Sequence, residues 1–477
     1  MPNFPMWDYQ QKNLAEIIDF FDHGGSSMIL QQPTGTGKSR VAVEFVRHYR
    51  EQSKPVYFIT QSSNLLWQFS DTLTEYGLDH GIIKSGCPTL RYRAQVVSVQ
   101  SLKSRIHMID EPFAVIFEEC HHAASSQFKA VLDAWPHVKI LGLTATPGRP
   151  DGKPLDMFEK IILSPGLRWF IDNYYLSDYD YFIPAEFNTS HLHHLAGDFN
   201  KNELEQYAQD DSARVGNFVQ HYQKYAAGLP GIAFGVSIAD AENIARVFNS
   251  SGYTMQSMHS KTPDIDQVMK DAKNGMYDLL STCDLIGEGT DIKRLTCMLD
   301  GRPTESIVIQ IQHWGRPLRA LYAPGYDLST LSERKAAMEA GGKGKAKILD
   351  FSSNYLRHGL PDDERDWSLT GKIKQATESK YKRCPSCQRP IPNFATTCPF
   401  CGYEFPRSAP AEEEPEERDG ELMPISQLTY QDKNGLTLRI AREAGNMKEA
   451  VKIAKAYGVN QQSAWFIWHK LLNKPLT

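Results

Sequence analysis

The sequence predicts an α/β protein with two tandem parallel-sheet units, then a small cysteine-rich module and a helical tail. Short apolar runs alternate with amphipathic stretches over residues 1–165, the alternation restarts after a Tyr-rich stretch at 169–184, and four cysteines cluster at 384–401. Such alternation is typical of parallel sheets covered by helices on both faces. Two units in tandem create one cleft between them, the usual place for a ligand.

The expected strands fall into two sets, one in each unit. In the first unit, residues 1–165, they are 27–31, 56–60, 96–99, 114–117 and 139–143, with a helix at 39–50. In the second, residues 166–370, they are 231–235, 254–258, 278–281, 297–300 and 347–350. We interpret the tyrosines of 169–184 as packing for the connector between the units.

Composition limits the class of protein. The formal net charge is −5, but the segment 411–421 carries seven acids and one Arg, a net of −6, so the remainder is +1. A cationic binding surface must then be a local groove. The sequence shows no apolar run of about 18 residues and no basic-then-apolar N-terminus. The four cysteines outside the cluster are scattered, which is unlike the disulfide framework of a secreted protein, so we expect a location in the cytoplasm. We also expect a monomer.

A phosphate-binding loop is predicted between the first strand and the following helix. Its residues are Thr34, Gly35, Thr36, Gly37, Lys38 and Ser39. Glycines let backbone N–H groups surround phosphate oxygens, Lys38 would reach the β and γ phosphates of ATP, and the Ser39 hydroxyl would bind Mg²⁺. The alternative is a glycine-rich turn with a surface lysine. The strand–turn–helix context favours the phosphate site, although Gln32 replaces the first glycine of the general pattern.

Carboxylates follow a second buried strand. Glu118 and Glu119, with His121, begin 80 residues after Lys38. In that position they would hold Mg²⁺ and orient the attacking water. Alone they could equally be solvated acids at a strand end, but the phosphate loop makes that alternative weak.

Two further motifs are consistent with a nucleotide-driven motor. Thr144 and Thr146 end a strand, where hydroxyls can link the nucleotide to a bound polymer; threonines are also common at strand ends. In the second unit, Arg316 and Arg319 follow Gln312 and lie three residues apart. Facing the phosphate loop they could act as arginine fingers, the alternative being a surface pair.

Together and in chain order, these motifs resemble the superfamily 2 DExH-type helicases over nearly all of residues 6–369. The resemblance implies two RecA-like domains, residues 1–165 and 166–370, that close on ATP. Gln10 resembles the adenine-reading Q motif, Gly289 and Asp291 resemble nucleotide contacts of motif V, and Gln312, Arg316 and Arg319 resemble motif VI. The implied nucleic-acid contacts are Gln61, Gln100, Ser101, Thr144, Thr146, His259 and Thr290.

The sequence departs from this family at two positions. Glu118 stands where the family has Asp, and because Mg²⁺ geometry is strict, the extra methylene implies slower turnover or an altered metal preference. Trp7 stands where the family usually has Arg, close to the Q motif.

The cysteine cluster predicts a structural zinc site at 380–406. Cys384, Cys387, Cys398 and Cys401 form two CxxC pairs separated by ten residues. Four thiolates at this spacing bind one Zn²⁺ in a closed shell, and in so short a segment the metal supplies the folding energy. Two disulfides are the disfavoured alternative. With this module, the chain is similar to bacterial and phage RadD-type helicases.

Beyond the zinc module we expect an acidic flexible linker, 407–424, and a small helical domain, 425–477. In the helical domain, Trp465, Phe466 and Trp468 fit a small core better than base stacking.

The leading hypothesis for function is an ATP-driven helicase on single-stranded, forked or branched DNA in replication, recombination or repair. A single-strand-binding protein is a partner by resemblance. The alternatives are an RNA helicase, a duplex translocase of a defence system, and a weakly hydrolysing, ATP-gated DNA-binding scaffold.

Overall fold

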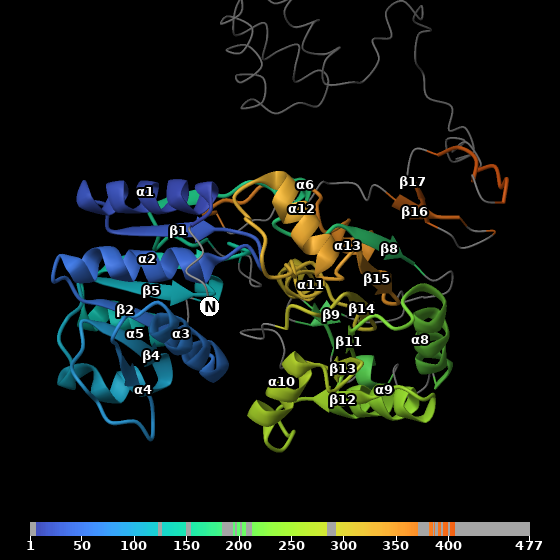
Figure 1. Cartoon of the computed structure of the whole chain (residues 1–477), viewed down its shortest axis with the longest axis horizontal. Coiled ribbons are helices and arrows are strands. Elements are labelled where there is room, and N and C mark those ends of the chain that lie inside the picture. The colour runs from blue at the N-terminus through green and yellow to red at the C-terminus, as the bar shows by residue number, and fades with distance from the viewer. Residues whose placement is uncertain are drawn as a thin grey trace, which may run out of the picture. The chain divides into compact units, whose positions relative to one another are not determined.

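The computed structural model describes residues 6–122, 126–148, 154–183, 194–195, 198–200, 203–206, 212–283 and 292–370, and parts of 381–405. These belong to one compact unit that spans Met1–Phe405. Two parallel sheets in succession dominate it, the first coloured blue to teal and the second green to orange (Figure 1). The predicted linker and helical tail, and the predicted site residues Gly289, Thr290, Asp291 and Cys387, lie outside the described residues.

The first sheet has seven strands in the order β3-β4-β2-β5-β6-β1-β7, each parallel to its neighbours. The strands are β1 (Ser27–Gln31), β2 (Val56–Thr60), β3 (Gly81–Ile83), β4 (Ala94–Ser98), β5 (Ala114–Glu118), β6 (Lys139–Thr144) and β7 (Lys160–Leu163). Because all run the same way, every loop that leaves a carboxyl end opens at the same edge. That edge carries the predicted phosphate loop after β1 and the acids after β5.

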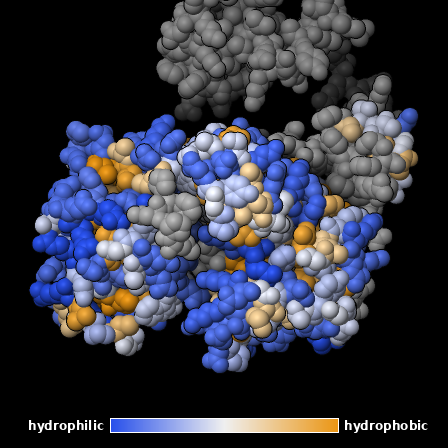
Figure 2. Space-filling model, viewed as in Figure 1, coloured by the Kyte–Doolittle hydropathy of each residue, from blue (hydrophilic) through white to orange (hydrophobic). Residues whose placement is uncertain are grey.

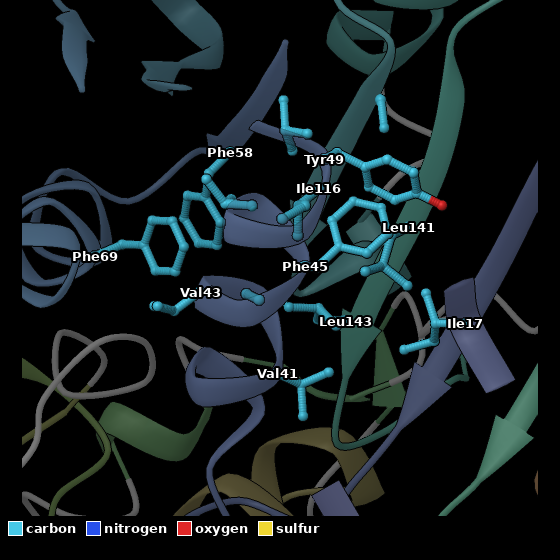
Figure 3. Close-up of a cluster of buried hydrophobic side chains, with 14 of the residues drawn as sticks. Ile17, Val41, Val43, Phe45, Tyr49, Phe58, Phe69, Ile116, Leu141 and Leu143 are labelled. Atoms are coloured by element: carbon cyan, nitrogen blue, oxygen red, sulfur yellow. The ribbon is translucent and has the colours of Figure 1, made fainter. Parts of the chain in front are cut away.

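Helices cover both faces of this sheet, as the alternation of buried side chains requires. The helices are α1 (Asp8–Asp22), α2 (Lys38–Glu51), α3 (Ser63–Glu75), α4 (Val99–Arg105) and α5 (Ser126–Ala134), with short 3-10 turns η1 (Ile106–Met108) and η2 (Cys120–His122). Residues of α1, α2 and α3 pack on one face, where Phe45 and Leu141 are completely buried (Figure 3). Residues of α4 and α5, among them Leu102 and Val131, pack on the other face.

The second sheet has six parallel strands in the order β12-β13-β11-β14-β15-β8. They are β8 (Tyr179–Phe182), β11 (Gly231–Phe234), β12 (Met255–Met258), β13 (Leu279–Thr282), β14 (Cys297–Asp300) and β15 (Ala346–Asp350). The helices are α6 (Leu167–Asp172), α8 (Ser212–Tyr225), α9 (Ile238–Ser250), α10 (Ile265–Asn274), α11 (Ile307–Trp314), α12 (Leu331–Ala340) and α13 (Asn354–His358). α8 and α9 pack on one face, and α10 and α11 on the other.

Two small antiparallel pairs complete the described structure: β9 (His194–Leu195) with β10 (Asp198–Phe199), and β16 (Tyr381–Arg383) with β17 (Pro390–Pro392). The second pair belongs to the cysteine-rich module. On the face that Figure 2 shows, hydrophobic residues form small areas on a mainly hydrophilic surface. None of the helices in the described part of the chain combines the length and apolar character that a membrane crossing requires.

The structure confirms the α/β class with two parallel-sheet domains and corrects the interpretation of two segments. The Tyr-rich stretch is more than a connector, because it forms α6 and then β8, the edge strand that pairs with β15. The strand expected at 96–99 begins earlier and ends one residue earlier, because β4 ends at Ser98 and α4 begins at Val99. Gln100 and Ser101 therefore lie in the first turn of a helix.

Candidate functional site: a phosphate loop against two arginines

The phosphate loop is held in shape by side chains from outside it. Gly35 and Gly37 have φ angles of +84° and +89°, a region that side chains disfavour, and the second glycine caps α2. The backbone oxygen of Thr36 accepts hydrogen bonds from Tyr9 Oη (2.6 Å), Gln32 Nε2 (2.8 Å) and Gln10 Nε2 (3.2 Å). Gln32, which replaces the usual first glycine, therefore braces the loop.

The loop fits a nucleotide phosphate. A β-carbon on Gly37 would lie 2.4 Å from Gln10 Nε2, so only glycine leaves room for the backbone turn. Lys38 opens α2, is 8% exposed, and its Nζ donates to Gln32 O at 3.2 Å across the loop. Ser39 follows at the helix N-terminus, where N–H groups and the helix dipole favour an anion. These residues would hold the phosphates of ATP, and Ser39 its Mg²⁺.

The acidic residues at the end of β5 lie beside the threonines at the end of β6. Glu119 has a φ of +49°, which turns its carboxylate from the strand direction toward Thr144. Thr144 Oγ1 donates to Glu119 Oε2 (3.3 Å), and His121 Nδ1 lies 3.0 Å from the same hydroxyl. Thr146 N donates to Thr144 Oγ1 at 3.0 Å. This network makes the position of the carboxylate depend on the strand that follows it.

Some predicted nucleic-acid residues are buried. Thr144 and Thr146 have no exposed surface, and His259 is 7% exposed with its Nε2 3.1 Å from Glu242 Oε1. The two threonines thus face the acidic network, as a link between sites requires, and direct contact with a polymer is excluded for them in this conformation. Gln61, Gln100 and Ser101 instead lie together at the carboxyl edge, where Gln100 Nε2 donates to Gln61 O at 3.1 Å.

The arginine motif of the second domain contacts the phosphate loop of the first. A β-carbon on Gly35 would lie 2.9 Å from Arg319 Cγ, and one on Gly315 would lie 2.7 Å from Thr34 Cβ. Arg316 and Arg319 both follow the end of α11, and Arg316 is 4% exposed. Gln312 lies on α11 itself. The structure thus brings motif residues more than 270 positions apart into one site.

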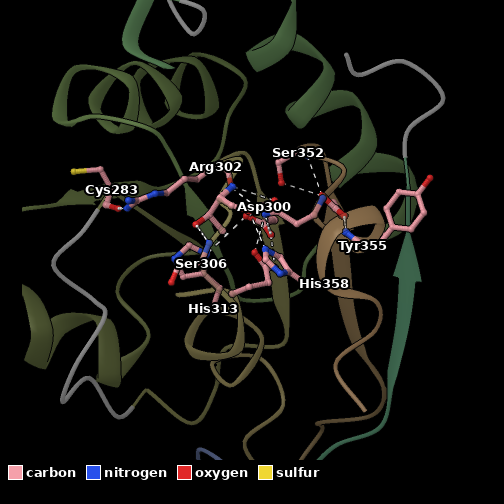
Figure 4. A network of polar contacts seen from close by, with 12 residues as sticks. Cys283, Asp300, Arg302, Ser306, His313, Ser352, Tyr355 and His358 are labelled. Carbon is pink, nitrogen blue, oxygen red and sulfur yellow. Dashed lines mark hydrogen bonds and ion pairs between the residues drawn. The ribbon is translucent and has the colours of Figure 1, made fainter. Parts of the chain in front are cut away.

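A buried polar network fixes α11 on its sheet, and no sequence motif predicts it. Asp300, at the end of β14, is completely buried and accepts hydrogen bonds from Gln310 Nε2 (2.7 Å) and Asn354 Nδ2 (3.1 Å). His313 stacks on Phe234 with ring centres 3.6 Å apart, and burial lowers its pKa. Figure 4 shows Asp300 at the centre of this network. No local signal marks these residues, because their partners are distant in sequence.

An aromatic cluster lies next to the phosphate loop. Tyr9 packs edge-to-face on Phe170 and Tyr175, and Trp7 on Tyr175. Arg334 of α12 lies over Tyr175, 4.3 Å from the ring centre. Tyr175 therefore packs the connector as expected, and Trp7 joins the same cluster from the N-terminus. The sequence does not predict this position of Arg334, because its aromatic partners come from two other segments.

The cysteine-rich module fits a tetrahedral metal. The sulfurs of Cys384, Cys398 and Cys401 all lie within 4.8 Å of one another, and those of Cys384 and Cys401 are 3.6 Å apart. Four sulfurs each about 2.3 Å from one Zn²⁺ stand about 3.8 Å apart. A disulfide requires about 2.05 Å, so these two sulfurs are not bonded to each other.

The fold and the site together define a nucleotide-hydrolysing motor with its phosphate loop in one domain and its arginines in the next. Residues 3–149 match the model "Type III restriction enzyme, res subunit" and residues 217–321 the "Helicase conserved C-terminal domain". Residues 382–407 match the uncharacterised protein family UPF0547.

Relatives with similar sequences agree with this class. A 51.5 kDa protein of a Lactococcus phage is 26% identical over 442 residues, covering 90% of this chain and 88% of its own. The putative ATP-dependent helicase IRC3 of Saccharomyces cerevisiae is 26% identical over 341 residues, or 65% of this chain and 49% of its own. A putative HsdR subunit fragment of a type I restriction enzyme from Vibrio vulnificus shares the fold (TM-score 0.56, 19% identity, 76% of this chain and 69% of its own).

Residues 3–149 and 217–321 thus carry the two halves of a superfamily 2 helicase motor of the DExH type, which are the domains of a nucleic-acid-dependent ATPase.

Proposed function

We propose that this helicase acts on DNA, and that it unwinds or remodels forked or branched DNA in replication, recombination or repair. The observation that carries the motor assignment is the contact of Arg319 with Gly35 across the two domains. The preference for DNA is supported by the cysteine-rich module, because the motor and this module together resemble the RadD-type helicases. We further propose a monomer, with a single-strand-binding protein as partner by resemblance alone.

We assign the site residues the following roles, which their positions support. Lys38, with Thr34, Gly35, Thr36 and Gly37, holds the phosphates, while Ser39 and Glu118 hold Mg²⁺. Glu119 orients the attacking water, supported by His121. Arg319 and Arg316 stabilise charge on the γ phosphate, and Gln312 lies on the helix before them. Cys384, Cys387, Cys398 and Cys401 bind one structural Zn²⁺.

Steady-state ATP hydrolysis with Mg²⁺ tests this function. The protein is assayed alone and with single-stranded DNA, forked DNA or RNA of one sequence, with Lys38→Ala as the control. We expect DNA to stimulate hydrolysis more than RNA, and Lys38→Ala to abolish the stimulation. Stronger stimulation by RNA would favour an RNA helicase. Tight DNA binding without stimulated turnover would favour the ATP-gated scaffold.

A duplex translocase is the second candidate, because residues 3–149 match a restriction-enzyme subunit model. Such a motor moves along duplex DNA without separating its strands. A strand-displacement assay on forked DNA, beside a triplex-displacement assay on plain duplex, separates the two. Displacement of the duplex strand supports the helicase, whereas triplex displacement alone supports the translocase.

A further inference from the structure

The half of the first sheet away from the phosphate loop carries an exposed tryptophan. Trp67 lies in the second turn of α3, which begins just after the carboxyl end of β2, and it is 41% exposed. Lys84 directly follows β3, and its Nζ lies 5.5 Å from the centre of the Trp67 ring. Because β2 and β3 run parallel in one sheet, both residues lie at the edge that also carries the phosphate loop.

The loops around this pair are tied into one rim. Gln100 Nε2 donates to Gln61 O at 3.1 Å, which joins the first turn of α4 to the loop after β2. Ser85 N donates to Ser101 Oγ at 3.0 Å, which joins the loop after β3 to the same turn of α4. Gln61, Gln100 and Ser101 are residues for which the sequence predicts contact with nucleic acid. The tryptophan and its lysine thus lie beside that predicted contact.

The charge pattern of this region suits a polyanion. Residues 52–70 contain no Asp or Glu, and neither do residues 80–109, which carry Lys84, Arg91, Arg93, Lys103 and Arg105. The nearest acid along α3 is Asp71, one turn further from the edge. Of these cations, Lys84 lies at the same edge as Trp67, whereas Arg91 and Arg93 precede β4 and lie at the opposite edge. In a chain whose net charge is −5, Lys84 is therefore the cation that a polyanion would meet beside Trp67, in segments of the sequence without a carboxylate.

We propose that Trp67 stacks on a base of the bound strand while Lys84 faces a neighbouring phosphate. This inference rests on the proposed function, since it names a contact of the strand that the motor grips. A planar ring stacks on any base regardless of its sequence, and a cation beside it adds attraction for the backbone. Trp67 would therefore let the motor hold strands that carry bases more tightly than a bare sugar-phosphate backbone.

The test compares two strands of equal length and charge, one of thymidines and one of abasic tetrahydrofuran residues. The measured quantity is the strand concentration that gives half-maximal ATPase stimulation. Wild-type protein is expected to need less of the thymidine strand. Trp67→Ala should raise that concentration about 5- to 100-fold for the thymidine strand, with little change for the abasic strand, and Trp67→Phe should recover most of the loss.

Tyr92 provides the matched control. It is also 41% exposed, but it precedes β4 and so lies at the opposite edge of the sheet. Tyr92→Ala should behave as wild type, and thermal unfolding verifies that each variant is folded. Equal shifts on both strands, or no shift for Trp67→Ala, would overturn the stacking contact while leaving the motor intact. If neither DNA nor RNA stimulates the wild-type protein, the proposed function itself fails.

Discussion

Arg319 lies directly over Gly35 of the phosphate loop, so close that a β-carbon on the glycine would stand 2.9 Å from Arg319 Cγ. The chain near Arg319 is held by Leu176, which forms an isolated antiparallel bridge with it. The second domain thus presents its arginine motif to the nucleotide site through backbone pairing as well as side-chain packing. This geometry explains how hydrolysis can depend on the way the two domains meet.

Replacing this arginine should separate catalysis from binding. Arg319→Ala is expected to lower stimulated ATP turnover about 10³-fold or more, because an arginine finger acts on charge that develops in the transition state. The affinity for ATP, measured by equilibrium binding, should change far less. Arg246→Ala, on the exposed side of α9, is the control. A large loss of ATP affinity with little loss of turnover would contradict the role of Arg319.

Glu118 should determine the metal preference. Its side chain is one methylene longer than the Asp of the resembling family, and Mg²⁺ tolerates little distortion of its octahedral shell. Glu118→Asp is therefore expected to raise the ratio of Mg²⁺-supported to Mn²⁺-supported turnover, by roughly tenfold. The ratio is measured at saturating ATP for both proteins. An unchanged ratio would mean that Glu118 does not set the metal geometry.

The zinc site should be separable from the rest of the protein. Metal analysis of purified protein should give about one Zn²⁺ per chain, and Cys384→Ser should reduce this to near zero. The variant's module should also become more sensitive to proteolysis, because the metal supplies its folding energy. Cys87→Ser, which replaces a cysteine outside the cluster, should retain the metal. Full zinc content in Cys384→Ser would exclude it as a ligand.

The second domain should lose stability in mild acid. Burial lowers the pKa of His358 to about 4, and its Nε2 lies 2.8 Å from Thr304 O. An unfolded histidine titrates near 6.5, so between these values the unfolded chain binds a proton that the folded chain does not. The stabilisation is therefore complete above about pH 6.5 and is lost as the pH falls toward 4.

The loss from His358 alone amounts to at most about 3 kcal/mol. Denaturant unfolding followed from pH 7 to 4.5 measures it, and His358→Gln, which retains an N–H donor, should flatten the dependence. His23→Gln, at a histidine whose side chain is 79% exposed, should not. A pH dependence that is identical in His358→Gln and in wild type would assign the acid sensitivity to other groups.

The sequence by itself determined the α/β class, the two sheets and most strands, because buried parallel strands are short apolar runs that need no distant partner to be seen. It also located the phosphate loop and the cysteine pairs, whose chemistry depends on local spacing. It missed β3 and β7, which are three and four residues long, and misread β8, whose alternating Tyr179–Phe182 pattern lacks a continuous apolar run. It extended the strand of β4 to Val99, since no apolar pattern marks where β4 ends and α4 begins.

Only the tertiary structure decided how the distant pieces meet. Gln32 departs from the phosphate-loop pattern, and only the structure shows its role: its side-chain amide donates a hydrogen bond to the backbone oxygen of Thr36. In the sequence, Asp300 is an ordinary strand end. In the structure, the side-chain amide of Asn354, 54 residues later, donates a hydrogen bond to its buried carboxylate. Contacts of this kind depend on through-space distance and on the exclusion of water, and neither of these is encoded in local residue spacing.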